Sequence, residues 1–166
     1  EEMDKAGIGT AMLSISTPGI WFGDVAQARR LTRGVNEYAA QMGRDNPGRF
    51  GQWAALPLPD IEGSLAEIAY AYDTLKADGV GLLTSYGPRW LGDPAFTPVL
   101  EELNRRKAVV YVHPNNPDCC GSLMSYVPAF MSEFTQDTNR AILSLVYSGA
   151  TRKFPDIRFI FSHAGG

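Results

Sequence analysis

The sequence has few cysteines, few charges and no long hydrophobic run. Its two cysteines, Cys119 and Cys120, are neighbours, and because a bridge between adjacent residues closes no loop, we expect packed, reduced thiols. The run at residues 108–112 is far shorter than the roughly 20 apolar residues that span a bilayer. Residues 1–5 have no signal-peptide character. These absences predict a soluble, cytoplasmic protein.

The sequence also lacks a large excess of either positive or negative charge. The 166 residues carry 15 basic and 18 acidic side chains, a net charge of -3, with no basic stripe or tail. This balance argues against a nucleic-acid or anionic-membrane partner and favours a small molecule or another protein. The hydrophobic content of 45% is enough for one core, so we expect a single domain over residues 1–166.

What is present is an alternation of strand and helix patterns. Asp24 is placed to cap an amphipathic helix that runs to Met42, and Ser64 with Glu67 forms an expected capping box for the next helix. Further helices are expected near Thr97 to Lys107 and within residues 133–148. Strands are predicted over residues 8–15, 50–58, 80–85, 108–112 and 157–161. Five strands separated by helices predict an α/β fold with a parallel sheet.

The two ends of the chain suggest a fragment. Residues 1–5 read as the last turn of a helix, and Gly165 with Gly166 closes a strand after which no crossover helix follows. An eight-stranded α/β barrel needs about 250 residues. We therefore expect an internal fragment of a larger barrel.

The two histidines, His113 and His163, each follow a predicted strand. In parallel α/β folds the carboxyl ends of the strands carry the functional groups. Each imidazole can also simply bond a neighbouring loop, but both histidines stand at equivalent strand ends, which favours function. Two histidines alone are not a metal signature, because a stable zinc site needs about three or four protein ligands.

Three segments carry a family resemblance: AVVYVHP at residues 108–114, FSHAGG at 161–166 and LGDPAF at 91–96. Together with residues 3–8 and 16–19, they resemble the amidohydrolase-related family of metal-dependent decarboxylases. That family includes the aminocarboxymuconate-semialdehyde and 6-methylsalicylate decarboxylases. The resemblance covers nearly the whole chain.

The resemblance implies a partial (β/α)8 TIM-type barrel, of which this chain would hold the second to sixth strands. It implies a divalent metal, zinc or alternatively manganese, with His113 as a ligand and His163 as the proton-handling catalytic residue. The family's first-strand His-x-His pair and late aspartate have no counterpart here, so we expect the fragment alone to be inactive. The implied reaction is removal of carbon dioxide from a small aromatic or unsaturated carboxylic acid by a longer protein, for which a homodimer is a further expectation.

Several loop residues are candidates for substrate binding. Trp21 and Phe22 in one loop, and Tyr86 and Trp90 in another, can sandwich a flat ring over the mouth of the sheet. Arg89 can pair with a substrate carboxylate. The alternatives are loop packing for the aromatic rings and an ordinary surface position for the arginine.

Two other functions fit the sequence. One keeps the barrel and the metal but makes the reaction hydrolytic, acting on a lactone or an amide. The other is an inactive partial barrel that serves as a binding module. Release of carbon dioxide, opening of a lactone, or weak and non-stoichiometric zinc binding would distinguish the three.

Overall fold

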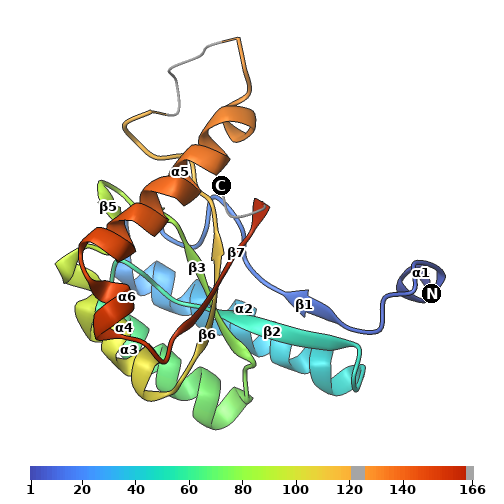
Figure 1. Cartoon of the computed structure of the whole chain (residues 1–166). Helices are drawn as coiled ribbons and strands as arrows, with labels where there is room; N and C mark the ends of the chain where they lie inside the picture. The colour runs from blue at the N-terminus through green and yellow to red at the C-terminus, as the bar shows by residue number, and fades with distance from the viewer. Residues whose placement is uncertain (121–125, 164–166) are drawn as a thin grey trace.

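The computed structural model describes residues 1–120 and 126–163 as alternating strands and helices (Figure 1). The strands are β1 (Ala11–Leu13), β2 (Phe50–Ala55), β3 (Gly79–Leu83), β4 (Ser85–Tyr86), β5 (Arg89–Trp90), β6 (Val109–His113) and β7 (Arg158–Phe161). The helices are α1 (Glu2–Lys5), α2 (Val25–Asp45), α3 (Ile61–Tyr70), α4 (Thr97–Arg105), α5 (Ala129–Tyr147) and α6 (Ala150–Lys153). A π-helical turn, η1 (Ala71–Leu75), extends α3, and a 3-10 turn, η2 (Pro94–Phe96), precedes α4.

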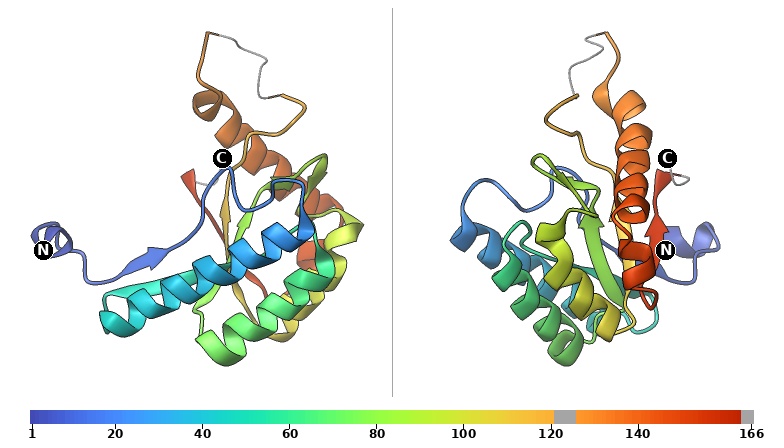
Figure 2. Two further views of the ribbon diagram at one scale, coloured as in Figure 1. Left: turned by 180° about the vertical axis from the view of Figure 1, so that it is seen from behind. Right: turned by 60° about the vertical axis from the view of Figure 1, so that its left-hand side comes forward.

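Five of the strands form one parallel sheet in the order β1-β2-β3-β6-β7. The prediction of a five-stranded parallel α/β sheet is therefore confirmed. β6 lies inside the sheet, paired with β3 and β7, whereas β1 and β7 form its edges. The fold is a partial TIM-type barrel, in which α2 to α6 gather on one side of the sheet and α1 lies apart at the N-terminal end (Figures 1 and 2).

The main core lies between this sheet and its covering helices. Val80 and Val110 from the sheet are fully buried against Ile68 of α3 and Leu103 of α4. On the opposite face the Trp53 ring of β2 and the Tyr111 ring of β6 are stacked across the intervening strand β3, with their centroids 6.2 Å apart. Only alternate residues of β6, Val110 and Val112, are fully buried, and Tyr111 between them lies on the opposite face.

The helix ends confirm one sequence prediction and correct another. The Asp24 side chain accepts a hydrogen bond from the Gln27 backbone N–H and caps α2 as predicted. The capping box at Ser64 is wrong, because α3 already begins at Ile61 and Asp60 is its cap. Ser64 lies inside the helix and donates to the Asp60 carbonyl oxygen at 2.6 Å.

The loop segments bring two further corrections. Residues 86–94, expected as loop, contribute to the antiparallel hairpin β4–β5. Cys119 and Cys120, expected as reduced thiols, are joined in a disulfide. A bond between neighbours leaves no spacing pattern, which is why the sequence did not indicate it. The predicted motif at residues 161–166 is described only as far as His163, and its last three residues lie outside the described part of the chain.

A membrane-spanning helix is not found among the described residues: none of their helices is both long and apolar enough to cross a bilayer.

Candidate metal and substrate site

The fold brings the two histidines together across 50 residues of sequence. His113 is the last residue of β6, and His163 follows β7, the next strand in the sheet. The pairing continues past the end of β7, because the Ser162 N–H donates to the Val112 carbonyl at 3.1 Å. As a result, the Nε2 atoms of His113 and His163 lie 3.4 Å apart. Parallel strands that end at one edge thus produce the pair.

The surroundings of His113 determine which of its nitrogens is free. Its Nδ1 lies 2.8 Å from the carbonyl oxygen of Pro114, and because a carbonyl oxygen only accepts, Nδ1 must carry the proton. This leaves the Nε2 lone pair directed toward His163. Burial lowers the pKa of the His113 imidazole, which favours the neutral, ligand-competent form. The Phe134 ring of α5 meets both imidazoles edge-on, at centroid distances of 5.7 Å and 5.5 Å.

This geometry fits a divalent metal ion. Two imidazole nitrogens on one tetrahedral zinc ion lie roughly 3.3 Å apart at the usual bond lengths, close to the 3.4 Å found between the two Nε2 atoms. The spacing also suits one imidazole on the ion and the other beside it. Within residues 1–120 and 126–163, no group of three or more His, Cys, Asp or Glu side chains could hold a metal. The described chain therefore offers two nitrogen donors.

A cavity of about 240 Å³ lies at the carboxyl ends of the first strands, and its described lining includes neither histidine. Its lining includes Leu83, which is the register partner of His113 on β3, and Asn115, two residues beyond His113. Trp21 and Tyr86 also line it. The Thr17 hydroxyl donates to Asn115 Oδ1 at 2.5 Å and ties the first loop to the loop after β6.

Only some of the predicted substrate-binding residues line this cavity. Trp21 and Tyr86 line the cavity, whereas the described lining does not include Arg89 or Trp90. The Tyr86 hydroxyl accepts the Leu83 N–H at 2.9 Å. Burial raises the pKa of Tyr86 far above its usual range, so the hydroxyl stays protonated. Phe22 is exposed, as is Arg89, which lies on the β4–β5 hairpin.

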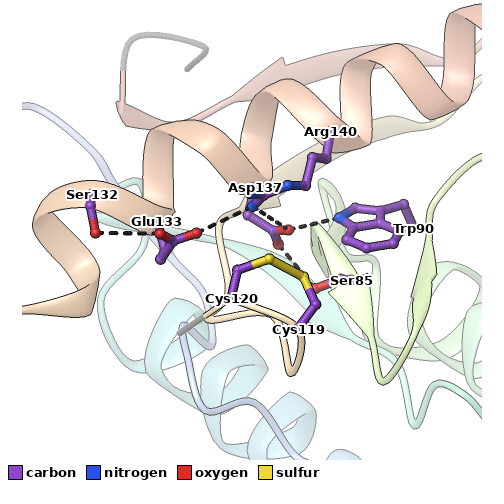
Figure 3. The surroundings of a disulfide bond; sticks show 8 residues. All are labelled: Ser85, Trp90, Cys119, Cys120, Ser132, Glu133, Asp137 and Arg140. Carbon is purple, nitrogen blue, oxygen red and sulfur yellow. Dashed lines mark hydrogen bonds and ion pairs between the residues drawn. A yellow bond between two sulfur atoms is a disulfide. The ribbon is translucent and has the colours of Figure 1, made fainter. Parts of the chain in front are cut away.

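Sequence reasoning missed a buried carboxylate, that of Asp137 (Figure 3). Asp137 of α5 is fully buried and accepts hydrogen bonds from Thr84, from Ser85 at 3.0 Å and from the Trp90 indole N–H at 2.7 Å. The signal available was its position one helical turn before Ala141, on the buried stripe of α5. A carboxylate on an apolar stripe indicates a buried polar network.

Comparison with known proteins gives the family. Residues 2–166 match the amidohydrolase family. This chain belongs to it. A 6-methylsalicylic acid decarboxylase of Penicillium expansum is 39% identical over 163 residues, which cover 96% of this chain and 50% of the relative. A decarboxylase of Penicillium terrestre is 40% identical over 168 residues, covering 95% of this chain and 50% of the relative.

Solved structures agree with these relatives. A dihydroxybenzoic acid decarboxylase of Polaromonas, with bound manganese and the inhibitor 2-nitroresorcinol, superposes with a TM-score of 0.90 at 26% identity. The match covers 99% of this chain and 53% of that one. The chain thus spans about half the length of the relatives it matches.

Proposed function

We propose that this chain supplies part of the active site of a metal-dependent carboxy-lyase, which removes carbon dioxide from a small aromatic or unsaturated carboxylic acid. The observation that carries the proposal is the histidine pair, with Nε2 atoms 3.4 Å apart at the carboxyl edge of the sheet. Relatives at 39% and 40% identity are decarboxylases, which favours this reaction over others on the same fold.

His113 is the proposed metal ligand, because its Nδ1 is engaged by the Pro114 carbonyl and its Nε2 lone pair is directed toward His163 and not toward the backbone. The proposed ion is zinc, or manganese as in the Polaromonas structure. When bound, such an ion orients a substrate carboxylate and polarises the groups attached to it. The chain's own contribution is to hold one imidazole nitrogen in a fixed place.

His163 is the proposed proton-handling residue. Loss of carbon dioxide breaks a carbon–carbon bond and leaves an electron pair on the substrate carbon, so a proton must reach that carbon before the product is complete. An imidazole gains and loses protons near neutral pH. His163 is exposed, unlike the half-buried His113, so it can exchange its proton with water between turnovers.

The 240 Å³ cavity is the proposed place for the substrate ring. Trp21 and Tyr86 supply its aromatic surface, which suits contact with a flat ring. Trp90 acts mainly through its hydrogen bond to Asp137, which holds the hairpin beside the cavity. Arg89 extends from the same hairpin and remains the proposed partner of a carboxylate group.

A direct assay distinguishes this reaction from hydrolysis. The full-length protein, loaded with zinc or with manganese, is incubated with 6-methylsalicylate and with 2,6-dihydroxybenzoate, and carbon dioxide is measured. The methyl esters of the same acids serve as controls, because they lack the carboxylate that leaves. We expect carbon dioxide from at least one acid and from neither ester. Metal-loaded protein that opens aromatic lactones and releases no carbon dioxide would contradict the proposal and support a hydrolase.

A further inference from the structure

We propose that Thr84 and Asp137 are positioning residues for His113, and that they act through the peptide group joining Pro114 to Asn115. The inference rests on the proposed function only in so far as His113 is taken as a metal ligand. The hydrogen-bond arrangement itself is a property of the chain without metal.

Three hydrogen bonds in series connect the buried carboxylate to the imidazole. The His113 Nδ1–H donates to the Pro114 carbonyl oxygen at 2.8 Å. The N–H of the same peptide group, on Asn115, donates to Thr84 Oγ1 at 2.9 Å. The Thr84 hydroxyl in turn donates to Asp137 Oδ2. Because each linking group accepts on one side and donates on the other, the bonds polarise one another in the same direction.

The carboxylate at the end of this series connects α5 both to Thr84 and to the β4–β5 hairpin. Asp137 is fully buried, and a buried carboxylate is costly unless it is paired and hydrogen-bonded. Ser85 and Trp90 donate further hydrogen bonds to it, and the Arg140 guanidinium pairs with it at 3.8 Å. Figure 3 shows Ser85, Trp90 and Arg140 converging on the Asp137 carboxylate. Among the described residues, the contact through Thr84 is the one that leads to His113.

Thr84 holds the backbone on both sides of Pro114, the residue that follows His113. Its backbone N–H donates to the His113 carbonyl at 3.0 Å, and its side-chain oxygen accepts the Asn115 N–H two residues further on. The intervening Pro114 carbonyl is thereby fixed in direction, and with it the Nδ1–H tautomer of the ring. Partners outside the ligand shell that orient a metal-binding histidine typically contribute about 10- to 100-fold to metal affinity.

The test measures the tautomer of His113 and the affinity for a metal ion in two separate experiments. In the full-length protein freed of metal by a chelator, NMR of the histidine ring nitrogens reports which nitrogen of His113 is protonated. We expect wild-type protein to hold the Nδ1–H form and Thr84→Val to show a mixture of both tautomers. Titration with manganese should give an affinity about 10- to 100-fold weaker for Thr84→Val than for wild type.

Matched variants control for the loss of a buried hydroxyl. Thr84→Ser keeps the hydroxyl and should restore both the tautomer and the manganese affinity. Thr32→Val makes the same exchange at a buried threonine of α2 that has no hydrogen-bond partner among the described residues, and it should leave both readouts unchanged. Asp137→Asn keeps the shape of the side chain but removes its charge, and should change both readouts in the direction of Thr84→Val.

The outcomes are decisive even if one variant is unstable. If Thr84→Val does not melt cooperatively, Asp137→Asn and Thr84→Ser decide the question. An unchanged tautomer and an unchanged manganese affinity in the folded variants would overturn the proposal. If His113→Ala still binds manganese as wild type does, the proposed metal role fails, but the tautomer comparison stands as a separate result.

Discussion

At the residue scale, the two imidazoles differ in how firmly the fold holds them. His113 ends an interior strand, is half-buried and has its Nδ1 bonded to a backbone carbonyl. His163 follows an edge strand, is exposed, and has ring contacts to His113 and Phe134. A fixed, neutral ring suits a ligand, whereas an exposed ring suits a group that changes its protonation state during the reaction.

This difference predicts the effect of removing His163. In the full-length protein, His163→Ala should retain its metal while turnover falls about 10²- to 10⁴-fold, the usual contribution of a positioned proton donor. Metal content by elemental analysis and carbon dioxide release are measured on the same preparation. Turnover near wild type would make His163 a structural residue, and loss of the metal would make it a ligand.

The lowered pKa of His113 predicts a pH dependence of stability. In the unfolded chain the imidazole has a pKa of about 6.5, and burial lowers the pKa in the folded protein. The unfolded state therefore binds more protons below that value, so the free energy of unfolding should decrease as pH falls from about 6.5 toward the folded pKa. Urea unfolding with chelator at several pH values measures the slope.

The matched variant for that measurement is His113→Gln, which cannot titrate. Its free energy of unfolding should depend less on pH over the same interval than that of wild type. An equal slope in both proteins would assign the pH dependence to other groups.

For single residues, the sequence allowed positions at strand ends to be predicted, but not the contacts between distant segments. The positions of both histidines were predictable, because a residue that follows a buried strand lies at a known edge of a parallel sheet. The contact of Asp137 with Thr84 was not, since 53 residues separate them and only the docking of α5 brings them together. The same holds for Trp90, whose indole reaches Asp137 from the hairpin.

At the element scale, the start of α2 depends on one side chain. Asp24 accepts the Gln27 N–H at 2.5 Å and satisfies one of the free backbone donors of the first turn. Asp24→Ala should lower the free energy of unfolding by about 1 kcal/mol. Asp24→Asn, which also caps well, is the control and should lie close to wild type. A free energy of unfolding that is unchanged in Asp24→Ala, measured by urea unfolding, would contradict the capping role.

The helix that was wrongly delimited shows why element ends are hard to predict. Ser64 and Glu67 have the spacing of a capping box, yet Glu67 pairs with Arg33 at 2.8 Å and accepts from Asn36 at 2.9 Å, both on α2. The Glu67 carboxylate therefore bonds side chains of α2, and Ser64 already lies inside α3. The pattern along one helix contains no information about the other, so the local rule failed where tertiary contacts prevailed.

At the scale of the whole molecule, the sheet has two unpaired edges, β1 and β7. Edge strands with free backbone groups recruit other chains. Expressed by itself, the 166-residue chain should therefore associate, and should release no carbon dioxide from aromatic acids. Size-exclusion chromatography with light scattering at several concentrations measures the association. A monomeric and active 166-residue protein would contradict this expectation.

A charge on the edge should reduce that association. Ile160 of β7 is 44% exposed, and Ile160→Lys places a cation on the edge strand. Leu31→Lys makes a similar exchange at a residue of α2 that is 39% exposed and serves as the control. We expect the first variant to shift toward monomer and the second to behave as wild type. Equal association in all three would exclude the β7 edge as the contact.

The order of the sheet could be predicted because parallel strands in sequence order are the simplest outcome of repeated strand–helix units. The remaining ligands of a metal site could not be placed, because the described residues supply only the two imidazole nitrogens. The hairpin β4–β5, which carries Trp90 toward Asp137, also lay beyond prediction. Its two-residue strands are too short to show a periodic pattern.

The metal content of His113→Ala tests whether His113 holds the metal of a decarboxylase site. The full-length wild-type protein and the variant are loaded with zinc or manganese, passed over a desalting column and analysed for bound metal per chain. We expect tightly held metal in the wild-type protein and loss of that metal in a variant that still melts cooperatively. A full equivalent of tightly held metal in His113→Ala would contradict it.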